Sequence, residues 1–170
     1  MTDELVNQAC ERAERLIEGG APRDDVLSCL VDAAERVGAP RAVSSILVID
    51  ECGLLRNGHS PGLPLDYLTA IDRLKPNPSV GTCAAAAATA SMVVTPDFLA
   101  DDKWAELKHL PHSLGYVGAW SMPIMSSRSG AVIGTFGTYY RDRREPTAFE
   151  IDAIGRLAKL AARAIERIEP

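Results

Sequence analysis

The cysteine at position 83 is the side chain of this sequence whose type and place most suggest chemistry. Cys83 opens the run CAAAAATAS, in which the alanines strongly favour a helix. A thiol in the first turn of a helix lies at the positive end of the helix dipole, which lowers its pKa and favours the reactive thiolate. One interpretation is therefore a redox or catalytic cysteine. The other is a small side chain buried among alanines.

Thiol chemistry of the redox kind needs a second cysteine close by to resolve the oxidised intermediate. The remaining cysteines, Cys10, Cys29 and Cys52, lie far apart in the sequence, and no CxxC pair occurs. Cys52 would serve Cys83 only if the fold brings the two together. The pattern argues against a disulfide scaffold or a thiolate zinc site, and we expect a protein of the reducing cytoplasm.

Two histidines and a charged run are further candidates for binding. His109 and His112 are spaced for one helical face, as in some metal and haem sites, but Pro111 interrupts the helix between them. We expect loop histidines and no metal site. The run RDRRE (141–145) fits either a grip on a phosphate or acidic partner or a solvated connection, and its alternating signs favour the connection.

Aromatic side chains are sparse, at 5% of the sequence, so the few that occur carry weight. Tryptophan and tyrosine bury a large apolar area and carry a polar tip that needs a partner. Trp104, Trp120 and Tyr139 are therefore candidates either for a ligand pocket or for the core. Because neighbouring residues of a strand face opposite sides, Trp120 and Ser121 cannot both line one pocket. The sequence does not decide which of them does.

The 170 residues are enough for one compact domain, which we place at 1–170 with its core at about 22–168 and an extra helix at 1–20. A net charge of −5 argues against a nucleic-acid partner. No apolar run approaches the roughly 20 residues of a membrane span, so we expect no membrane partner. The start of the chain is acidic and amphipathic, unlike a signal peptide.

Apolar periodicity and turn residues divide the chain into helices and strands. The expected helices are 3–17, 22–37, a short one within 63–74, 80–91, 101–110 and 147–168, and the expected strands are 42–50, 54–60, 92–96, 117–125 and 131–140. Strand follows strand without strict alternation with helices. The order predicts an α+β fold, a mainly antiparallel sheet of five to six strands with terminal helices on one face and a helical and loop excursion on the other.

The last helix has a recognisable start and an unusually wide apolar surface. Thr147 and Glu150 have the spacing of a capping box. Apolar residues extend well beyond the arc of about 100° that covers a sheet. The extra width predicts a second packing surface, either for another subunit or for the N-terminal helices of the same chain, and both stay open.

Several segments resemble the GAF domain family of small sensory modules. PSVGTCAAAA resembles the family's Gly-Ser-Cys-Gly-Thr-Ala segment, VVTPDFLADDKW its strand and Trp-bearing helix, and GAWSMPIMSSRSGAVIGTFGTYYRDRREPTAFEIDAIGRLAKLAARAIER its closing hairpin and helix. The resemblance covers about residues 22–168. The chain departs from the family at Ala84–Ala86, lacks the cyclic-nucleotide signature, and has no histidine after Cys83 as in bilin attachment. The resemblance therefore implies a fold and a theme and leaves the ligand and any cofactor open.

The resemblance implies a non-catalytic sensory or regulatory module of bacterial signal transduction. Such a module binds a small molecule in a cavity between the sheet and the excursion, forms a homodimer through its terminal helices and acts on a signalling output domain or protein. The expected ligand-binding residues are Cys83, Trp104, Trp120, Ser121, Thr135 and Tyr139. The alternatives are a redox enzyme of the free methionine-R-sulfoxide reductase type that uses Cys83, and a dimerisation module without a ligand.

Overall fold

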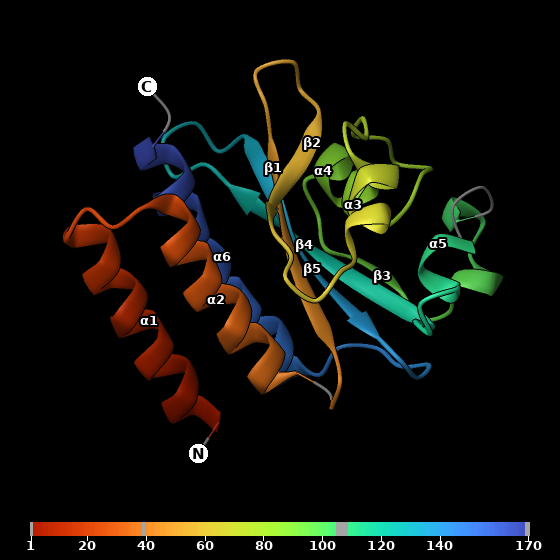
Figure 1. The fold of residues 1–170 in the computed structure, drawn as a ribbon, viewed down its shortest axis with the longest axis horizontal. Coiled ribbons are helices and arrows are strands. Elements are labelled where there is room, and N and C mark those ends of the chain that lie inside the picture. The colour runs from red at the N-terminus through yellow and green to blue at the C-terminus, as the bar shows by residue number, and fades with distance from the viewer. Residues whose placement is uncertain (1, 39, 105–108, 169–170) are drawn as a thin grey trace.

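A computed structural model describes residues 2–38, 40–104 and 109–168, and it contains the five-stranded antiparallel sheet that the sequence predicts (Figure 1). The sheet order is β2-β1-β5-β4-β3, so the long β5 lies at the centre. The strands are β1 (Val43–Ile49), β2 (Leu55–His59), β3 (Val93–Thr95), β4 (Gly118–Met125) and β5 (Val132–Tyr140).

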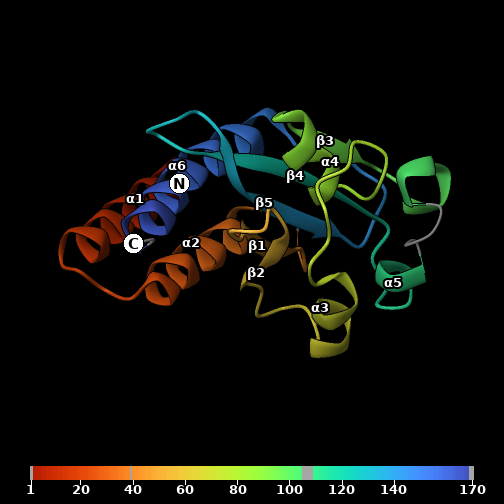
Figure 2. The same ribbon diagram turned by 90° about the horizontal axis from the view of Figure 1, so that it is seen from above.

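Helices cover the two faces of the sheet in the predicted way. Figures 1 and 2 show three long helices on one face and the shorter helices on the other. The long helices are α1 (Thr2–Glu18), α2 (Arg23–Val37) and α6 (Ala148–Ile168), and the excursion holds α3 (Leu65–Ile71), α4 (Cys83–Thr89) and α5 (His109–His112). The α+β prediction is confirmed. No helix in the described ranges is both long and apolar enough to cross a membrane.

The helix expected at 101–110 differs from the structure. A 3-10 turn spans Asp102–Trp104, residues 105–108 lie outside the described residues, and α5 then begins at His109. Pro111, which we expected to break a helix, lies inside α5. A proline is compatible with a first helical turn because the N–H groups there have no partner within the helix.

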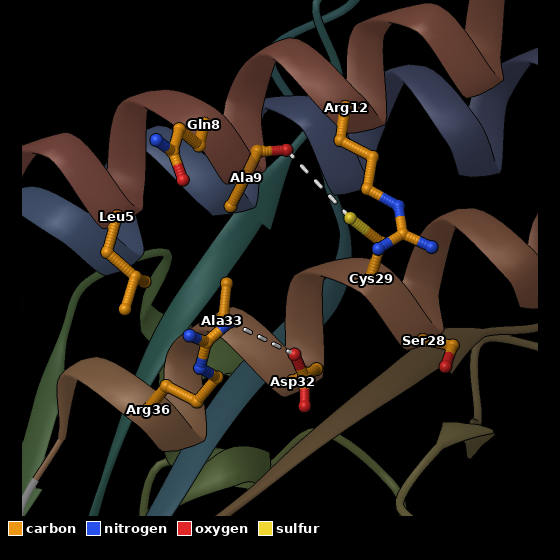
Figure 3. Close-up of a pocket in the computed structure, with 9 residues that line it drawn as sticks. All are labelled: Leu5, Gln8, Ala9, Arg12, Ser28, Cys29, Asp32, Ala33 and Arg36. Carbon is orange, nitrogen blue, oxygen red and sulfur yellow. Dashed lines mark hydrogen bonds and ion pairs between the residues drawn. The ribbon is translucent and has the colours of Figure 1, made fainter.

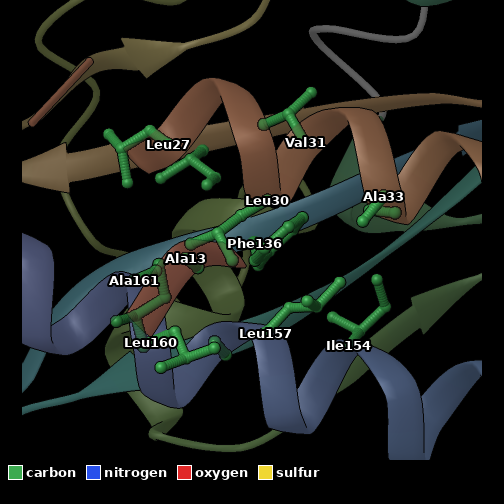
Figure 4. Packing of buried hydrophobic residues seen from close by; sticks show 14 of the residues in the cluster. Ala13, Leu27, Leu30, Val31, Ala33, Phe136, Ile154, Leu157, Leu160 and Ala161 are labelled. Atoms are coloured by element: carbon green, nitrogen blue, oxygen red, sulfur yellow. The ribbon is translucent and has the colours of Figure 1, made fainter. Parts of the chain in front are cut away.

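The main core lies between the sheet and the three long helices (Figure 4). Leu30 of α2, Phe136 of β5 and Leu157 of α6 are completely buried there. The helix α1 adds Ala13 to this core, and α1 contacts both α2 and α6. The wide apolar surface of α6 is therefore covered by helices of the same chain.

Two arginines of α6 hold α1 in place. The guanidinium of Arg156 donates a hydrogen bond of 2.7 Å to the side-chain oxygen of Asn7. At the other end, the guanidinium of Arg167 donates to the carbonyl oxygens of Ile17 and Ala21, where α1 ends. A cation at this point satisfies carbonyl groups that have no partner within the helix. Polar contacts thus hold α1 against α6 at Asn7, in its first half, and at its C-terminal end.

The predicted capping box at the start of α6 is present. The N–H of Glu150 donates to Thr147 Oγ1 at 3.1 Å, and the N–H of Thr147 donates to Glu150 Oε1 at 3.1 Å. The other carboxylate oxygen of Glu150 accepts a 2.8 Å hydrogen bond from the hydroxyl of Tyr140, the last residue of β5. The carboxylate therefore joins the central strand to the terminal helix.

A second carboxylate joins the turn between β4 and β5 to the other end of α6. Glu166 accepts hydrogen bonds from the hydroxyl of Ser126 at 2.8 Å and from the N–H and hydroxyl of Ser127 at 2.9 and 3.0 Å. These donors hold the pKa of Glu166 below its usual range, the Ser127 N–H foremost. The carboxylate must be ionised for this arrangement to reach full strength.

We expect Glu166→Gln to lower the free energy of unfolding at pH 7 by about 1–2 kcal/mol, because charged hydrogen bonds become neutral ones. The pKa of Glu166 is lower in the folded than in the unfolded protein. Its contribution to stability is therefore complete above the unfolded pKa of about 4.3 and is lost as the pH falls through the folded pKa. Urea unfolding at pH 7 and at pH 3 should show that the variant loses less free energy of unfolding on acidification than the wild type does. Glu145→Gln, at an exposed position, is the control and should depend on pH as the wild type does. The same pH dependence of stability in Glu166→Gln and in the wild type would contradict the assignment.

Candidate functional site

A group of hydroxyls and one thiol lies on the excursion side of the sheet. Cys83, at the start of α4, lies beneath β4 and β5, and the Ser121 hydroxyl donates to its sulfur at 3.5 Å. Gly137 leaves room for the thiol, since a Cβ atom there would lie 3.2 Å from the sulfur. Three residues that are distant in the sequence therefore meet at one point.

Thr135 is the polar group of this cluster whose hydrogen bonding is incomplete. Its hydroxyl is fully buried and makes no hydrogen bond of normal geometry within the described part of the chain. It lies near enough to Cys83 to favour the thiolate. A buried hydroxyl without a partner costs about 1–3 kcal/mol, so it marks a place where a ligand or water would be accommodated.

The Cys83 thiol is less reactive than its place at a helix start predicted. Burial raises its pKa, and the hydroxyls of Ser121 and Thr135 oppose that effect only in part. The helix α4 has only seven residues, so its dipole is small. The raised pKa favours the protonated form of the thiol, which is the weaker nucleophile.

Tyr139 faces the same side of the sheet and belongs to an aromatic cluster beside the thiol. Its hydroxyl lies 2.8 Å from that of Tyr67 on α3, and the two rings meet edge to face at 5.9 Å. Burial raises the pKa of both hydroxyls. Phe98 and Tyr116 complete the cluster, so aromatic side chains occupy the region where we expected a cavity. A hollow of about 70 Å³ at Tyr67 lies at its outer edge.

Trp104 is next to the cluster but has its own partners. Its indole N–H donates to Thr82 Oγ1 at 2.8 Å, and Thr82 Oγ1 lies 3.0 Å from Thr95 Oγ1. Its ring packs on Phe98 at 4.5 Å between centroids. The polar tip is satisfied within the protein, so Trp104 supports the segment that precedes Cys83.

Trp120 lies on the opposite face of the sheet, within the core formed by the long helices. The structure thus brings together Cys83, Ser121 and Thr135, places Tyr139 and Trp104 beside them, and keeps Trp120 apart. Sequence reasoning missed Tyr67, although a lone tyrosine in a short amphipathic helix was a signal. Thr82, which accepts the hydrogen bond from Trp104, could not be predicted because no sequence motif marks it.

Within the described residues, His112 and the charged run do not assemble a site of their own. His112 is exposed, and the side chain of His109 lies outside the described residues. Within the described chain no cluster of metal-ligating side chains occurs. Arg141 donates to the Leu114 carbonyl oxygen at 3.1 Å and stacks on Tyr116, so the first residue of the charged run anchors a loop.

Comparison with known proteins identifies the family. A sequence profile described as GAF domain matches residues 2–166. The chain belongs to the GAF domain family. Among curated proteins, it is 32% identical over 168 residues to the methyl sulfide methyltransferase-associated sensor of Methanosarcina acetivorans. The match covers 98% of this chain and only 16% of that protein.

Solved GAF structures share the fold. The GAF domain of a phosphoenolpyruvate-protein phosphotransferase from Coxiella burnetii has a TM-score of 0.76 at 15% identity and covers 95% of this chain and 93% of that one. A free methionine-R-sulfoxide reductase from Neisseria meningitidis has a TM-score of 0.72 at 16% identity, covering 98% and 89%. At these identities the likeness concerns the GAF fold alone.

Proposed function

We propose that this chain is a non-catalytic sensory module of a cytoplasmic signalling protein, in which a small molecule binds on the excursion side of the sheet. The observation that carries the proposal is the buried hydroxyl of Thr135, which lies next to Cys83 and Ser121 and makes no hydrogen bond of normal geometry within the described residues. The relative's name as a sensor supports the same theme.

The chemistry of this point favours a small, neutral and mostly apolar ligand. Its hydrogen-bonding groups are two hydroxyls and a protonated thiol, and aromatic rings surround it. Ligand sites of this kind are mostly apolar with a few placed polar groups. Because Tyr139 is only 4% exposed, binding requires α3 to move outward and break the hydrogen bond between Tyr67 and Tyr139.

The strand β5 provides a route from the ligand to the terminal helix. Thr135 lies on its ligand side, and Tyr140, at its end, binds Glu150 in the first turn of α6. A ligand that favours one position of β5 therefore favours one packing of α6. The mechanism is a population shift between two arrangements of the long helices, which an attached or partner output element detects.

Dimerisation would use the groove between α1 and α2, because the apolar surface of α6 is covered from within. The groove encloses about 320 Å³ (Figure 3). The residues that line it include the small or apolar Leu5, Ala9 and Ala33 and the charged Arg12 and Arg36. We take a second copy as the occupant, because the exposed face of α1 is rich in glutamates that would complement Arg12, whereas Arg36 already pairs with Asp32 at 3.9 Å.

Enzyme activity of the sulfoxide-reductase kind is the alternative, because structures of such reductases share the fold. That chemistry needs a resolving thiol near Cys83. Cys52 is exposed on the turn between β1 and β2, while Cys10 and Cys29 belong to the long helices on the opposite face. We expect no reduction of free methionine sulfoxide, and activity that Cys83→Ser abolishes would overturn the non-catalytic proposal.

Thr135→Val and Thr138→Val form the test of the ligand site, because the two threonines lie on opposite faces of β5. We expect native mass spectrometry of the purified protein to show a dimer with a reproducible bound mass. Thr135→Val should lose that mass while keeping or gaining up to about 1 kcal/mol of stability, since it removes an unpaired buried hydroxyl. Thr138→Val should keep the mass, because its hydroxyl pairs with Ser44 in the core.

The outcomes separate the candidate functions. Loss of the mass in both variants would show that it depends on overall packing rather than on Thr135. A dimer without any bound mass would favour the ligand-free dimerisation module. A monomer would remove the proposed role of the groove.

A further inference from the structure

Two cysteines that are distant in the sequence lie on facing helices. The tight turn at 19–22 makes α1 and α2 antiparallel neighbours. The Cys29 thiol points from α2 to the backbone of α1, where its sulfur lies 3.9 Å from the Ala9 carbonyl oxygen (Figure 3). Ala9 directly precedes Cys10. Because that oxygen lies about 2.8 Å from the next Cα atom in a trans peptide, the Cys29 sulfur is within about 7 Å of the Cys10 Cα.

The side chains around this crossing permit a close approach. Ala9 and Ala13 on α1 and Ala33 on α2 are small. Cys10 is 7% exposed and packs in the helix-side core, while Cys29 is half-buried at the groove and packs against the same core. A disulfide requires Cα atoms about 4.4–6.8 Å apart and sulfurs that turn toward one another. Cys10 lies near enough to Cys29 to raise the pKa of that thiol by its charge. A disulfide would require rotation about χ1 and a shift of α1 to bring the two sulfurs together.

We propose that Cys10 and Cys29 are a site of reversible oxidation, at which a peroxide joins the two thiols in a disulfide that ties α1 to α2. Cys29 is the more accessible thiol whenever the groove is not covered by a partner copy, and it reacts first: its sulfur takes one oxygen from hydrogen peroxide, giving a sulfenic acid and one water. The Cys10 sulfur then attacks the Cys29 sulfur, and a second water leaves. Two thiols lose two electrons and two protons, and one peroxide is reduced to two waters.

Exposure, rather than thiol acidity, sets this order of events. Burial raises the pKa of Cys29, which Arg12 opposes and Asp32 reinforces. Burial also raises the pKa of Cys10, which Arg156 opposes and Glu14 reinforces. Both thiols are therefore expected to react slowly at neutral pH. The disulfide would fix α1, which Arg156 and Arg167 already bind to α6. Oxidation would therefore lock one arrangement of the three long helices whether or not a ligand is present.

The test is oxidation of the full chain by hydrogen peroxide, followed by alkylation and tryptic digestion without reduction. We expect a cross-linked peptide pair that joins residues 1–12 to residues 24–36. We also expect an intact mass about 2 Da below that of the reduced chain and a single-chain band on a non-reducing gel. The melting temperature should rise by about 5 °C and return to its original value after reduction.

The wild-type chain carries the main result, so the proposal does not depend on the folding of a variant. Cys29→Ala should lose the cross-link and the thermal shift, and Cys52→Ser, on an exposed turn, should keep both. A chain in which Cys29 ends as a sulfinic acid without the cross-link would overturn the proposal. So would a disulfide that joins two chains or uses Cys52.

Discussion

Trp120→Ala is expected to lower the free energy of unfolding by about 3–5 kcal/mol, as for other fully buried tryptophans. The side chain is 1% exposed and packs in the core beneath the long helices. Truncation leaves a large cavity between β4 and the helices, which the rigid sheet cannot close. Urea unfolding followed by circular dichroism measures the loss.

Met125→Ala is the matched control, because Met125 ends the same strand and is 38% exposed. We expect a loss below about 1 kcal/mol there. Trp120→Phe serves a different purpose, since it keeps most of the packing and removes an indole N–H without a normal hydrogen bond. That variant should keep any bound small molecule. Loss of the molecule with unchanged stability would place Trp120 in the ligand site after all.

Glu150→Ala is expected to cost about 2–4 kcal/mol, the sum of a lost helix cap and a buried tyrosine hydroxyl without an acceptor. Glu150 accepts from the Thr147 N–H and from the Tyr140 hydroxyl, and Tyr140 is almost fully buried. The contact also lies on the proposed route from β5 to α6. Removing this contact should therefore weaken the coupling between β5 and α6 and also lower the stability of the protein.

A double-mutant cycle with Tyr140→Phe isolates this contact. In the Tyr140→Phe background the hydroxyl is gone, so Glu150→Ala should cost about 1–2 kcal/mol less than in the wild type. Additive losses would show that the two side chains do not interact. Thr147→Ala, which removes only the cap, should cost about 1 kcal/mol.

Local chemistry explains why much of the fold could be predicted. Thr147 and Glu150 are three residues apart, so their capping box depends on backbone geometry that any helix start provides. The hairpin of β4 and β5 follows from two apolar runs around the Ser126–Gly130 turn. The terminal helices follow from apolar periodicity and from Gly38, which ends α2. These signals depend on a few neighbouring residues, so they can be read from the sequence without knowledge of the rest of the chain.

The candidate site was only partly predictable because its members meet through long-range packing. Alternation along β4 showed that Trp120 and Ser121 face opposite sides, but only the sheet with its helices decided that Trp120 lies in the core. The position of Cys83 at a helix start predicted a lower pKa. Burial under β4 and β5 raised it instead, because desolvation of the thiolate outweighs the dipole of a seven-residue helix.

The sequence by itself determined the α+β order of elements, the cap of α6 and the alternation of residues along each strand. Only the tertiary structure decided what covers the wide surface of α6 and which side chains share a site. α6 packs against α1, where Arg167 binds the Ile17 carbonyl oxygen, and the Ala9 carbonyl oxygen of α1 meets the Cys29 thiol of α2. The physical reason is that helix and turn signals act over a few residues, whereas burial, thiol pKa and side-chain contacts depend on chain segments that meet only after folding.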